Sequence, residues 1–269
     1  MPAPWSLDDI PWKDFDPAKV DPDLLRIAKA ASLVERNAND YAIYLCHIFD
    51  DNPEFQKIVH QWAREEEQHG EALRRWVEMA DANFDFEKSF RRFTEGFRIP
   101  IDADRSVRGS RTGELIARCV VEVGTSSYYS ALADTSEEPV LEKICRNIAS
   151  DEFRHYKLFY TYMQHYYPKD RPSVFARLRI ALGRVLESED DELAYAYFCA
   201  NDEAEPYVRK ESSGEYMRRA YRCYKPQHLE RAIAMTMKAS GLRLNDRLLR
   251  GLAWTAHRFL RWRARSATA

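Results

Sequence analysis

Apolar residues recur at spacings of three and four along most of the chain, which is the pattern of amphipathic helices. The pattern predicts four long helices, at residues 22–49, 53–80, 111–134 and 138–167. A long connection separates the second helix from the third, and its stretch from Phe84 to Phe97 is amphipathic enough to form a short helix. Two helix pairs joined by one long crossover are typical of ferritin-like proteins. We therefore predict an all-α, ferritin-like four-helix bundle.

The sequence on either side of this bundle has a different character. Residues 1–21 are rich in proline and carry Trp5, Trp12 and Phe15, so we expect an extended arm whose aromatic rings pack on the bundle. After the bundle the pattern indicates further helices, at residues 172–188, 190–200, 204–222 and 226–264. The predicted organisation is an N-terminal arm (1–21), a bundle (22–168) and a C-terminal helical extension packed on the bundle (169–269).

Composition limits the partners and the cellular compartment that we expect for the protein. The formal net charge of -2 gives no reason to expect a nucleic-acid partner. The five cysteines are scattered and include no Cys-x-x-Cys pair, as in reduced intracellular proteins without disulfides or a zinc or rubredoxin-type iron site. The first residues are acidic and unlike a signal peptide, and no stretch approaches the ~20 apolar residues that span a bilayer. We therefore expect a cytoplasmic protein.

The second and fourth predicted helices each carry a Glu-x-x-His pair on their apolar side: Glu66 with His69, and Glu152 with His155. Residues three apart share a face of a helix, so each carboxylate points the same way as its imidazole. An unpaired charge is costly to bury, so these groups must be paired or bound to a metal. One such pair alone would be more typical of a solvated helix face, but two pairs in equivalent helices favour a shared site.

Single glutamates precede the two pairs, Glu35 in the first helix and Glu122 in the third, and the four positions are 31, 56 and 30 residues apart. Glu35 lies beside the apolar stripe of its helix, and a place at the polar edge of that stripe is the alternative. Two Glu-x-x-His helices and two helices with one Glu each supply a two-metal site in the core of a bundle. The predicted metal ligands are Glu35, Glu66, His69, Glu122, Glu152 and His155.

Four carboxylates and two imidazoles suit iron or manganese better than copper or zinc. The four negative charges also balance two divalent ions, so we expect two iron ions, with manganese or a mixed manganese–iron pair as the alternative. Each histidine needs a partner for its second ring nitrogen. Asp151 and Glu65, each directly before a ligand glutamate, are the candidates to hold the histidine of the opposing helix.

The centre of the third helix is unusual because small or polar residues follow Glu122, namely Gly124, Thr125, Ser126 and Ser127. Such residues are poor helix formers. One interpretation is tight packing against a neighbouring helix. The other is a distorted turn, such as a π-bulge, that leaves space beside the metals for oxygen and substrate, with the Thr125 hydroxyl as a catalytic group.

The sequence from Arg243 to Arg265 has seven arginines against a single acid, interleaved with leucine, tryptophan and phenylalanine. This composition predicts an amphipathic basic helix. The helix is either a docking helix with a cationic outer face or a binding surface for an anionic partner or membrane.

The ligand segments resemble those of the soluble acyl-carrier-protein desaturases over about residues 24–185. The family's second-helix motif is similar to Trp62-x-x-Glu65-Glu66-x-x-His69-Gly70. Its fourth-helix motif is similar to Cys145-x-x-Ile148-Ala149-x-Asp151-Glu152-x-Arg154-His155. Tyr41 lies six residues after Glu35, as in the family's first ligand helix, and Thr125 lies three after Glu122, where the family has a threonine next to the oxygen site.

The resemblance implies a di-iron enzyme that uses dioxygen and two electrons from a ferredoxin-type donor. Its substrate would be a small or carrier-bound apolar molecule such as a long acyl chain, and such enzymes are commonly homodimers. The resemblance also places Trp62 and Tyr41 around the ligands. Gln68 and Phe153 stand where the family usually has Arg and Lys.

Other functions share this ligand frame. Aldehyde-deformylating oxygenases and N-oxygenases have a similar spacing, so desaturation and oxygenation both stay open. A ferritin- or rubrerythrin-like protein that handles iron or reduces peroxide is the alternative from another class. The lack of a Cys-x-x-Cys pair argues against a full rubrerythrin, and the large C-terminal half argues against a minimal ferritin subunit.

Overall fold

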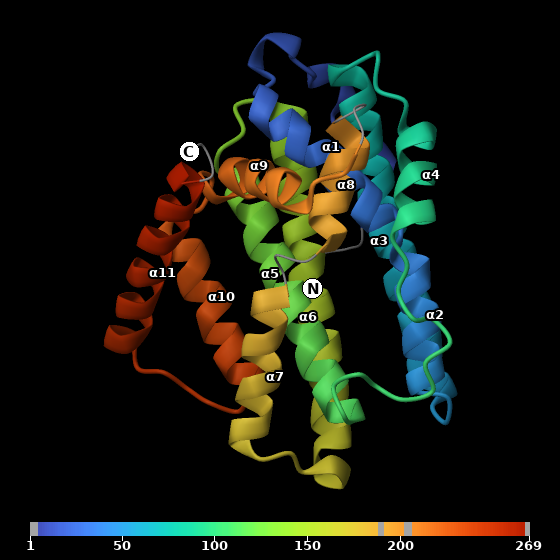
Figure 1. The fold of residues 1–269 in the computed structure, drawn as a ribbon, viewed down its shortest axis with the longest axis vertical. Coiled ribbons are helices and arrows are strands. Elements are labelled where there is room, and N and C mark those ends of the chain that lie inside the picture. The colour runs from blue at the N-terminus through green and yellow to red at the C-terminus, as the bar shows by residue number, and fades with distance from the viewer. Residues whose placement is uncertain (1–4, 188–190, 202–205, 267–269) are drawn as a thin grey trace.

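The structure, a computed structural model, describes residues 5–187, 191–201 and 206–266 (Figure 1). These described residues form eleven α-helices and three short 3-10 turns, and they contain no strand. The helices are α1 (Pro22–Arg36), α2 (Ala38–Ile48), α3 (Pro53–Ala80), α4 (Phe86–Gly96), α5 (Arg111–Ala133), α6 (Pro139–Asp170), α7 (Val174–Glu187), α8 (Asp191–Asn201), α9 (Arg209–Tyr221), α10 (Pro226–Ala239) and α11 (Asp246–Ser266). The expected all-α fold is confirmed.

A ferritin-like bundle forms the centre of the molecule. The α1 and α2 helices pack along α3, α5 packs along α6, and α3 contacts α6 across the bundle. The crossover between α3 and α5 runs down the outside of the bundle and carries α4, which packs against α8 and α1 (Figure 1). A short connection joins α5 (Arg111–Ala133) to α6 (Pro139–Asp170), and the crossover places this second helix pair against the first.

The core of the bundle consists of two apolar clusters stacked along its axis. One cluster includes Leu33, Trp76 and Ile144, and the other includes Phe55 and Phe159, all of them fully buried. In α3, α5 and α6 the sequence passes from one cluster to the other near the middle of the helix. The buried acids and histidines of the predicted ligand set occupy this level, between the two clusters.

The first predicted helix, 22–49, is wrong as a single helix because the chain breaks at Asn37. The Asn37 N–H bonds to Val34 O, three residues back, at 3.1 Å, and Asp40 N–H bonds to Asn37 O at 3.3 Å. Asn and Asp side chains compete with the helix for backbone hydrogen bonds, and three of them lie at positions 37, 39 and 40. The result is α1, which ends directly after Glu35, followed by α2.

Two other helix boundaries also differ from the prediction. The predicted helix 226–264 is α10 and α11, separated at Gly241, whose φ of +78° suits glycine. Helix α6 continues past Pro168 to Asp170, because the missing Pro168 N–H and the proline ring affect only the last, exposed turn. It ends where Arg171 takes a left-handed φ of 43°.

Side-chain caps fix where the bundle helices begin. The Asp21 carboxylate accepts hydrogen bonds from Asp23 N and Leu24 N, and Pro22 occupies the first helical position. The Glu138 carboxylate caps α6 through Val140 N and Leu141 N. Its Oε2 also accepts a 2.6 Å hydrogen bond from Trp76 Nε1 on α3. This buried contact fixes the register of α3 against α6.

The remaining segments cover the bundle. Helix α8 packs on α1, α7 and α10 pack on α5, and α11 packs on α10 and α9. From Trp5 onward the N-terminal arm forms three 3-10 turns, and its Trp5, Trp12 and Phe15 rings pack on the core. Residues 1–4 of that predicted arm lie outside the described residues. Within the described part of the chain, no helix has both the length and the apolar content needed to cross a bilayer.

The approach of α3 to α1 beside the cluster depends on Gly70. A Cβ at Gly70 would lie 2.7 Å from Arg36 N and 3.0 Å from Arg36 Cα. We predict that Gly70→Ala lowers the free energy of unfolding by about 1–3 kcal/mol, measured by urea denaturation, since backbone atoms must shift. Gly251→Ala on α11 is the matched control, because a Cβ there meets nothing within 4 Å. Equal stabilities for the two variants would contradict the close approach.

Candidate metal centre

Six acidic and imidazole side chains converge between the two apolar clusters. They are Glu35 from α1, Glu66 and His69 from α3, Glu122 from α5, and Glu152 and His155 from α6. None is more than 9% exposed. The structure therefore brings together all six side chains that the sequence nominated as metal ligands, and it places Glu35 inside the bundle rather than at a polar edge.

The six residues fall into two overlapping groups. One group is Glu35, Glu66, His69 and Glu152, and the other is Glu66, Glu122, Glu152 and His155. Within each group, one potential ligand atom of every residue lies within 4.8 Å of the others. Glu66 and Glu152 belong to both groups, so the arrangement consists of two adjacent sets of ligand atoms with two carboxylates in common.

The two common carboxylates are turned so that each offers one oxygen to either side. His69 Nδ1 lies 3.2 Å from Glu66 Oε2 and 3.3 Å from Glu152 Oε1. His155 Nδ1 lies 3.0 Å from Glu66 Oε1 and 3.9 Å from Glu152 Oε2. Each outer glutamate has one histidine as its neighbour: Glu35 Oε2 is 3.8 Å from His69 Nδ1, and Glu122 Oε2 is 3.6 Å from His155 Nδ1.

The outer nitrogen of each histidine meets a carboxylate from the opposing helix. His69 Nε2 is 3.2 Å from Asp151 Oδ2, and His155 Nε2 is 2.9 Å from Glu65 Oε2. These are the two contacts that the sequence nominated. Arg154 joins both carboxylates, because its Nη2 lies 2.6 Å from Asp151 Oδ1 and 3.1 Å from Glu65 Oε2. Sequence reasoning missed Arg154, although its place directly before a ligand histidine was visible.

The N-terminal arm closes one side of the cluster. Trp5 Nε1 donates a 2.8 Å hydrogen bond to Asp151 Oδ2, and the Trp5 ring stacks parallel to the His69 ring with centroids 6.0 Å apart. Gln68 Nε2 donates to Trp5 O at 3.0 Å and holds the arm in place. No short-range pattern links Trp5 to residues so distant in the sequence, so this contact had to come from the structure.

Tyr129 is a further neighbour that the sequence did not single out. Its hydroxyl donates a 2.5 Å hydrogen bond to Glu35 Oε1. Tyr129 is only 1% exposed, whereas the adjacent Tyr128 points to a different side of α5 and is half-buried. One turn before Tyr129 on α5, Thr125 donates to the shared Glu152, so two hydroxyls of this helix hold carboxylates of the cluster.

Burial and mutual repulsion shift the ionisation of the cluster. Burial raises the pKa of Glu35 to about 8, and burial likewise raises the pKa of Glu122 well above its ordinary value. Burial opposes ionisation of Glu66 too, but His155 and His69 outweigh it and hold its pKa well below the usual range. The carboxylates in turn raise the pKa of both histidines well above normal, against the effect of burial. The metal-free cluster therefore holds protons that bound metal ions would displace.

Several polar atoms of the cluster lack hydrogen-bond partners. Glu122 Oε1, Glu152 Oε1 and His155 Nδ1 are buried and make no hydrogen bond of good geometry. Leaving such a group unsatisfied in a dry interior costs roughly 1–3 kcal/mol each. These are all atoms that coordinate cations, and the donor set of carboxylate oxygens and imidazole nitrogens suits iron or manganese. The residues present thus fit a bound metal pair.

Helix α5 is regular through Gly124 and Thr125, so the distorted turn expected there is wrong. The Thr125 hydroxyl oxygen lies 2.9 Å from Glu152 Oε2 and 3.1 Å from both Val121 O and Glu122 O, so the carboxylate is the nearest of its three acceptors. Packing explains part of the small-residue run, because Ser126 Oγ donates to Ala149 O on α6 at 2.8 Å. Gly124 differs: it is exposed, and a Cβ there would meet nothing within 4 Å.

The two remaining predicted neighbours of the ligands have different surroundings. Trp62 is 5% exposed and sets its ring edge-on to His155, with centroids 6.5 Å apart. Tyr41 instead donates its hydroxyl to Glu192 Oε2 on α8 at 2.7 Å, with the Arg118 guanidinium 4.9 Å above its ring. Its described hydrogen bond therefore ties α2 to α8 rather than supporting the cluster.

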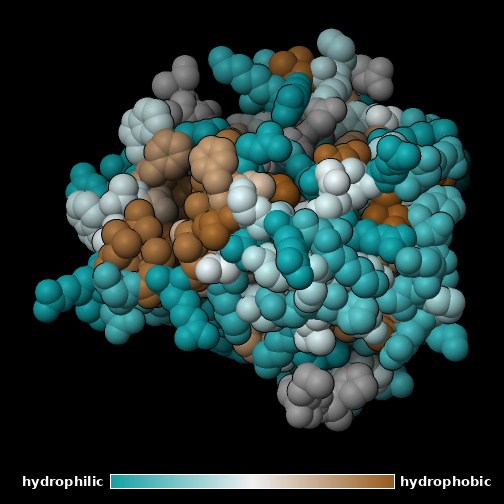
Figure 2. All heavy atoms as spheres, turned by 90° about the horizontal axis from the view of Figure 1, so that it is seen from below, coloured by the Kyte–Doolittle hydropathy of each residue, from teal (hydrophilic) through white to brown (hydrophobic). Residues whose placement is uncertain are grey.

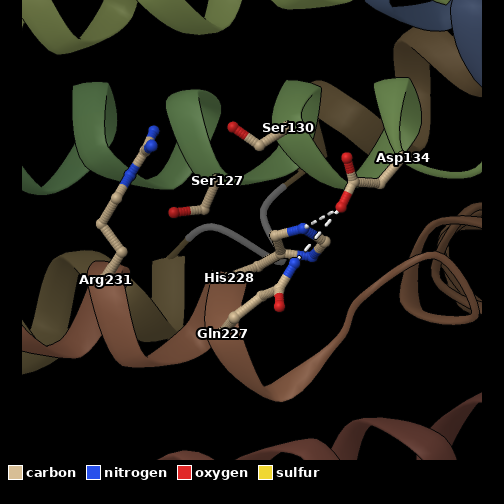
Figure 3. A pocket seen from close by; sticks show the side chains of 6 residues that line it. All are labelled: Ser127, Ser130, Asp134, Gln227, His228 and Arg231. Atoms are coloured by element: carbon tan, nitrogen blue, oxygen red, sulfur yellow. Dashed lines mark hydrogen bonds and ion pairs between the residues drawn. The ribbon is translucent and has the colours of Figure 1, made fainter.

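A cavity of ≈ 230 Å³ lies apart from this cluster, between α5 and α10 (Figure 3). It is lined by Ser127, Ser130, Asp134, Gln227, His228 and Arg231. Asp134 occupies one end, where its Oδ2 is 3.2 Å from His228 Nε2 and 3.3 Å from Gln227 Nε2. The cavity is polar and its one described carboxylate is paired, so it is not the space for an apolar substrate.

The carboxylates behind the histidines provide a direct test of this arrangement. We predict that Asp151→Asn and Glu65→Gln each weaken iron binding by about 10–100-fold, because the neutral amide lacks the negative charge that holds the imidazole N–H. Titration of the metal-free protein with ferrous iron measures the affinity. Glu67→Gln is the matched control, since Glu67 neighbours Glu66 but pairs with Arg36 at the surface. Unchanged affinity in both test variants would show that the two acids do not support metal binding.

A comparison with protein families agrees with the site. Residues 44–176 match the family model described as fatty acid desaturase. The matched segment is just under half of the chain and contains five of the six clustered residues, all but Glu35. No curated protein sequence matches the chain. The chain is thus similar to the fatty acid desaturases over the segment that builds the cluster, and this similarity supports an oxidoreductase.

Proposed function

We propose that the protein is a non-haem di-iron oxidoreductase that activates dioxygen on an apolar, acyl-chain-like substrate, by desaturation or by oxygenation. The observation that carries the proposal is the pair of shared carboxylates. Glu66 and Glu152 each present one oxygen to the His69 side and the other to the His155 side. Carboxylates with this orientation suit two metal ions, whereas a single metal ion would use only one of the two oxygens.

In this proposal Glu35 and His69 complete one metal position, and Glu122 and His155 complete the other. An iron pair supplies the two-electron chemistry that dioxygen activation requires. The four carboxylates neutralise two ferrous ions, so the loaded site introduces no net charge into the core. Manganese, or a mixed manganese–iron pair, has the same ligand preferences and stays as the alternative metal content.

Residues around the ligands would hold them in the required form. Asp151 and Glu65 accept the Nε2–H of His69 and His155, which leaves each Nδ1 unprotonated toward the metal. Tyr129 donates to Glu35, and Thr125 donates to Glu152, so the carboxylates are oriented as well. The Trp5 ring covers one side of the His69 ring.

The acyl-type substrate rests on the family similarity over residues 44–176. The two reducing equivalents would come from a ferredoxin-type donor.

Metal content and turnover test the proposed function together. We predict about two irons per chain in the iron-loaded protein. His69→Ala and Glu152→Ala should each remove most of that iron. His69 is a ligand of one metal position, and Glu152 is a ligand of both. Glu71→Gln, an outward carboxylate on α3, should retain the iron.

With reduced ferredoxin and a long-chain acyl thioester, the loaded protein should consume oxygen and yield a desaturated or hydroxylated acyl product by mass spectrometry. Iron retained by both ligand variants would refute the site. Iron uptake far above two per chain, with no acyl product, would assign the protein to iron storage instead.

A substitution at Thr125 distinguishes the orientation of a ligand carboxylate from metal binding itself. Thr125→Val keeps the volume and removes the hydrogen bond to Glu152 Oε2. We predict unchanged iron content with slower or uncoupled oxygen reaction, seen as more hydrogen peroxide released per product. Thr125→Ser should restore coupling, because it returns the hydroxyl. Equal turnover and coupling in Thr125→Val would remove this residue from the reaction.

A further inference from the structure

Exposed large hydrophobic side chains are concentrated on two helices of the C-terminal extension. Ten of the thirteen such side chains among the described residues lie on α7 or α11. They are Val174, Phe175, Leu182, Val185, Leu186, Leu248, Leu252, Trp254, Phe259 and Trp262. Single exposed hydrophobic residues are normal, but a concentration of this kind marks an interaction site.

We use the term C-terminal apolar surface for six of these residues: Phe175, Leu182 and Leu186 of α7, and Leu248, Leu252 and Phe259 of α11. Phe175 and Leu186 are each 78% exposed, which leaves most of both side chains in water. Helix α10 lies between the two helices and contacts both. From the end of the molecule that is lowest in Figure 1, hydrophobic residues gather on the side of α10 and α11, within a hydrophilic surround (Figure 2).

Helix α11 has three distinct faces. Ala253 is fully buried and marks the face that packs on α10 and α9. At about 100° per residue, Leu248, Leu252 and Phe259 fall within about 40° of one another and form an exposed apolar stripe. Four exposed arginines occupy an arc of about 80° on the next face. They are Arg247, Arg250, Arg258 and Arg261.

The arginine face is not neutralised within the described part of the chain. None of the four arginines has a carboxylate of the described residues within ion-pair distance. Arg258 lies 4.8 Å above the ring of Trp254, which is itself 55% exposed. In a chain with a formal net charge of -2, positive charge is thus concentrated beside the large apolar surface.

A helix with an apolar stripe, a flanking row of arginines and an exposed tryptophan has the composition of helices that lie in the interface of an anionic membrane. Apolar side chains enter the acyl region there, while arginines reach the lipid phosphates. A second copy of this chain is a poorer partner, since a two-fold contact through α11 would bring two arginine rows together. We propose that the C-terminal apolar surface and the arginine row of α11 bind the protein to an anionic lipid bilayer.

The surface is preformed, because α11 is anchored on α10 and α9 through its buried face. Binding therefore needs no folding step and no rearrangement of the buried carboxylate and histidine side chains. The proposal is independent of the proposed function, although a membrane is also where long acyl chains are found. Attachment would be peripheral and would weaken as salt screens the arginines.

Sedimentation of the full chain with vesicles tests the proposal. We expect binding to vesicles of equal parts phosphatidylglycerol and phosphatidylcholine, and at least about 10-fold weaker binding to pure phosphatidylcholine. Changing Arg247, Arg250, Arg258 and Arg261 to Gln should also weaken binding at least about 10-fold. The matched control changes four exposed arginines of the N-terminal half to Gln: Arg64, Arg91, Arg98 and Arg105.

The apolar stripe is tested separately with Leu252→Ser combined with Phe259→Ser. This variant should lose vesicle binding, whereas Val107→Ser, which alters a 66% exposed side chain in the crossover, should not. Circular dichroism checks that each variant stays folded, and iron content checks the bundle. Absence of binding to anionic vesicles, or equal loss in the control variants, would overturn the proposal. Retention on an immobilised acidic carrier protein without vesicle binding would likewise overturn it, in favour of a protein partner.

Discussion

Burying four carboxylates and two imidazoles in one layer of a helical bundle is the constraint on which the rest of this structure depends. Each uncompensated charge in such a place would cost several kcal/mol, which is a large part of the net stability of a folded domain. Without metal, the cluster balances itself by protonation, with raised pKa values at Glu35, Glu122 and both histidines. With two divalent ions, the same six side chains balance the metal charge instead. The fold therefore has to hold these groups together in either state.

Cross-bracing between helices α3 and α6 meets this requirement. Each helix supplies one histidine and, one turn away, the carboxylate that holds the histidine of the other helix. Arg154 ties the two bracing carboxylates to each other, and the Glu138–Trp76 hydrogen bond fixes the same two helices further along their length. The register of α3 against α6 is thus set by polar contacts on both sides of the cluster, while the apolar clusters fill the space above and below it.

Helical periodicity explains why the ligand set could be predicted from the sequence. An acid and a histidine three residues apart on an apolar stripe face the same way, and the long crossover fixes which helices are neighbours. Asp151 and Glu65 could be predicted for the same reason, since each neighbours a ligand on its own helix. Contacts between distant segments could not be predicted in that way. Trp5 reaches Asp151 through an irregular arm, and Tyr129 reaches Glu35 because of how α5 is rotated against α1. The break at Asn37 was missed because the apolar stripe continues across it, so periodicity alone predicted one helix.

X-ray absorption at the iron edge of the iron-loaded protein tests the two-metal centre most directly. We predict a ligand shell of oxygen and nitrogen only, and a second iron at ~3.5–4 Å, the usual separation in two-metal sites. The second-iron signal should disappear in Glu152→Ala, which lacks a carboxylate common to the two positions. A single isolated iron, or a sulfur ligand from one of the five cysteines, would contradict the two-metal centre.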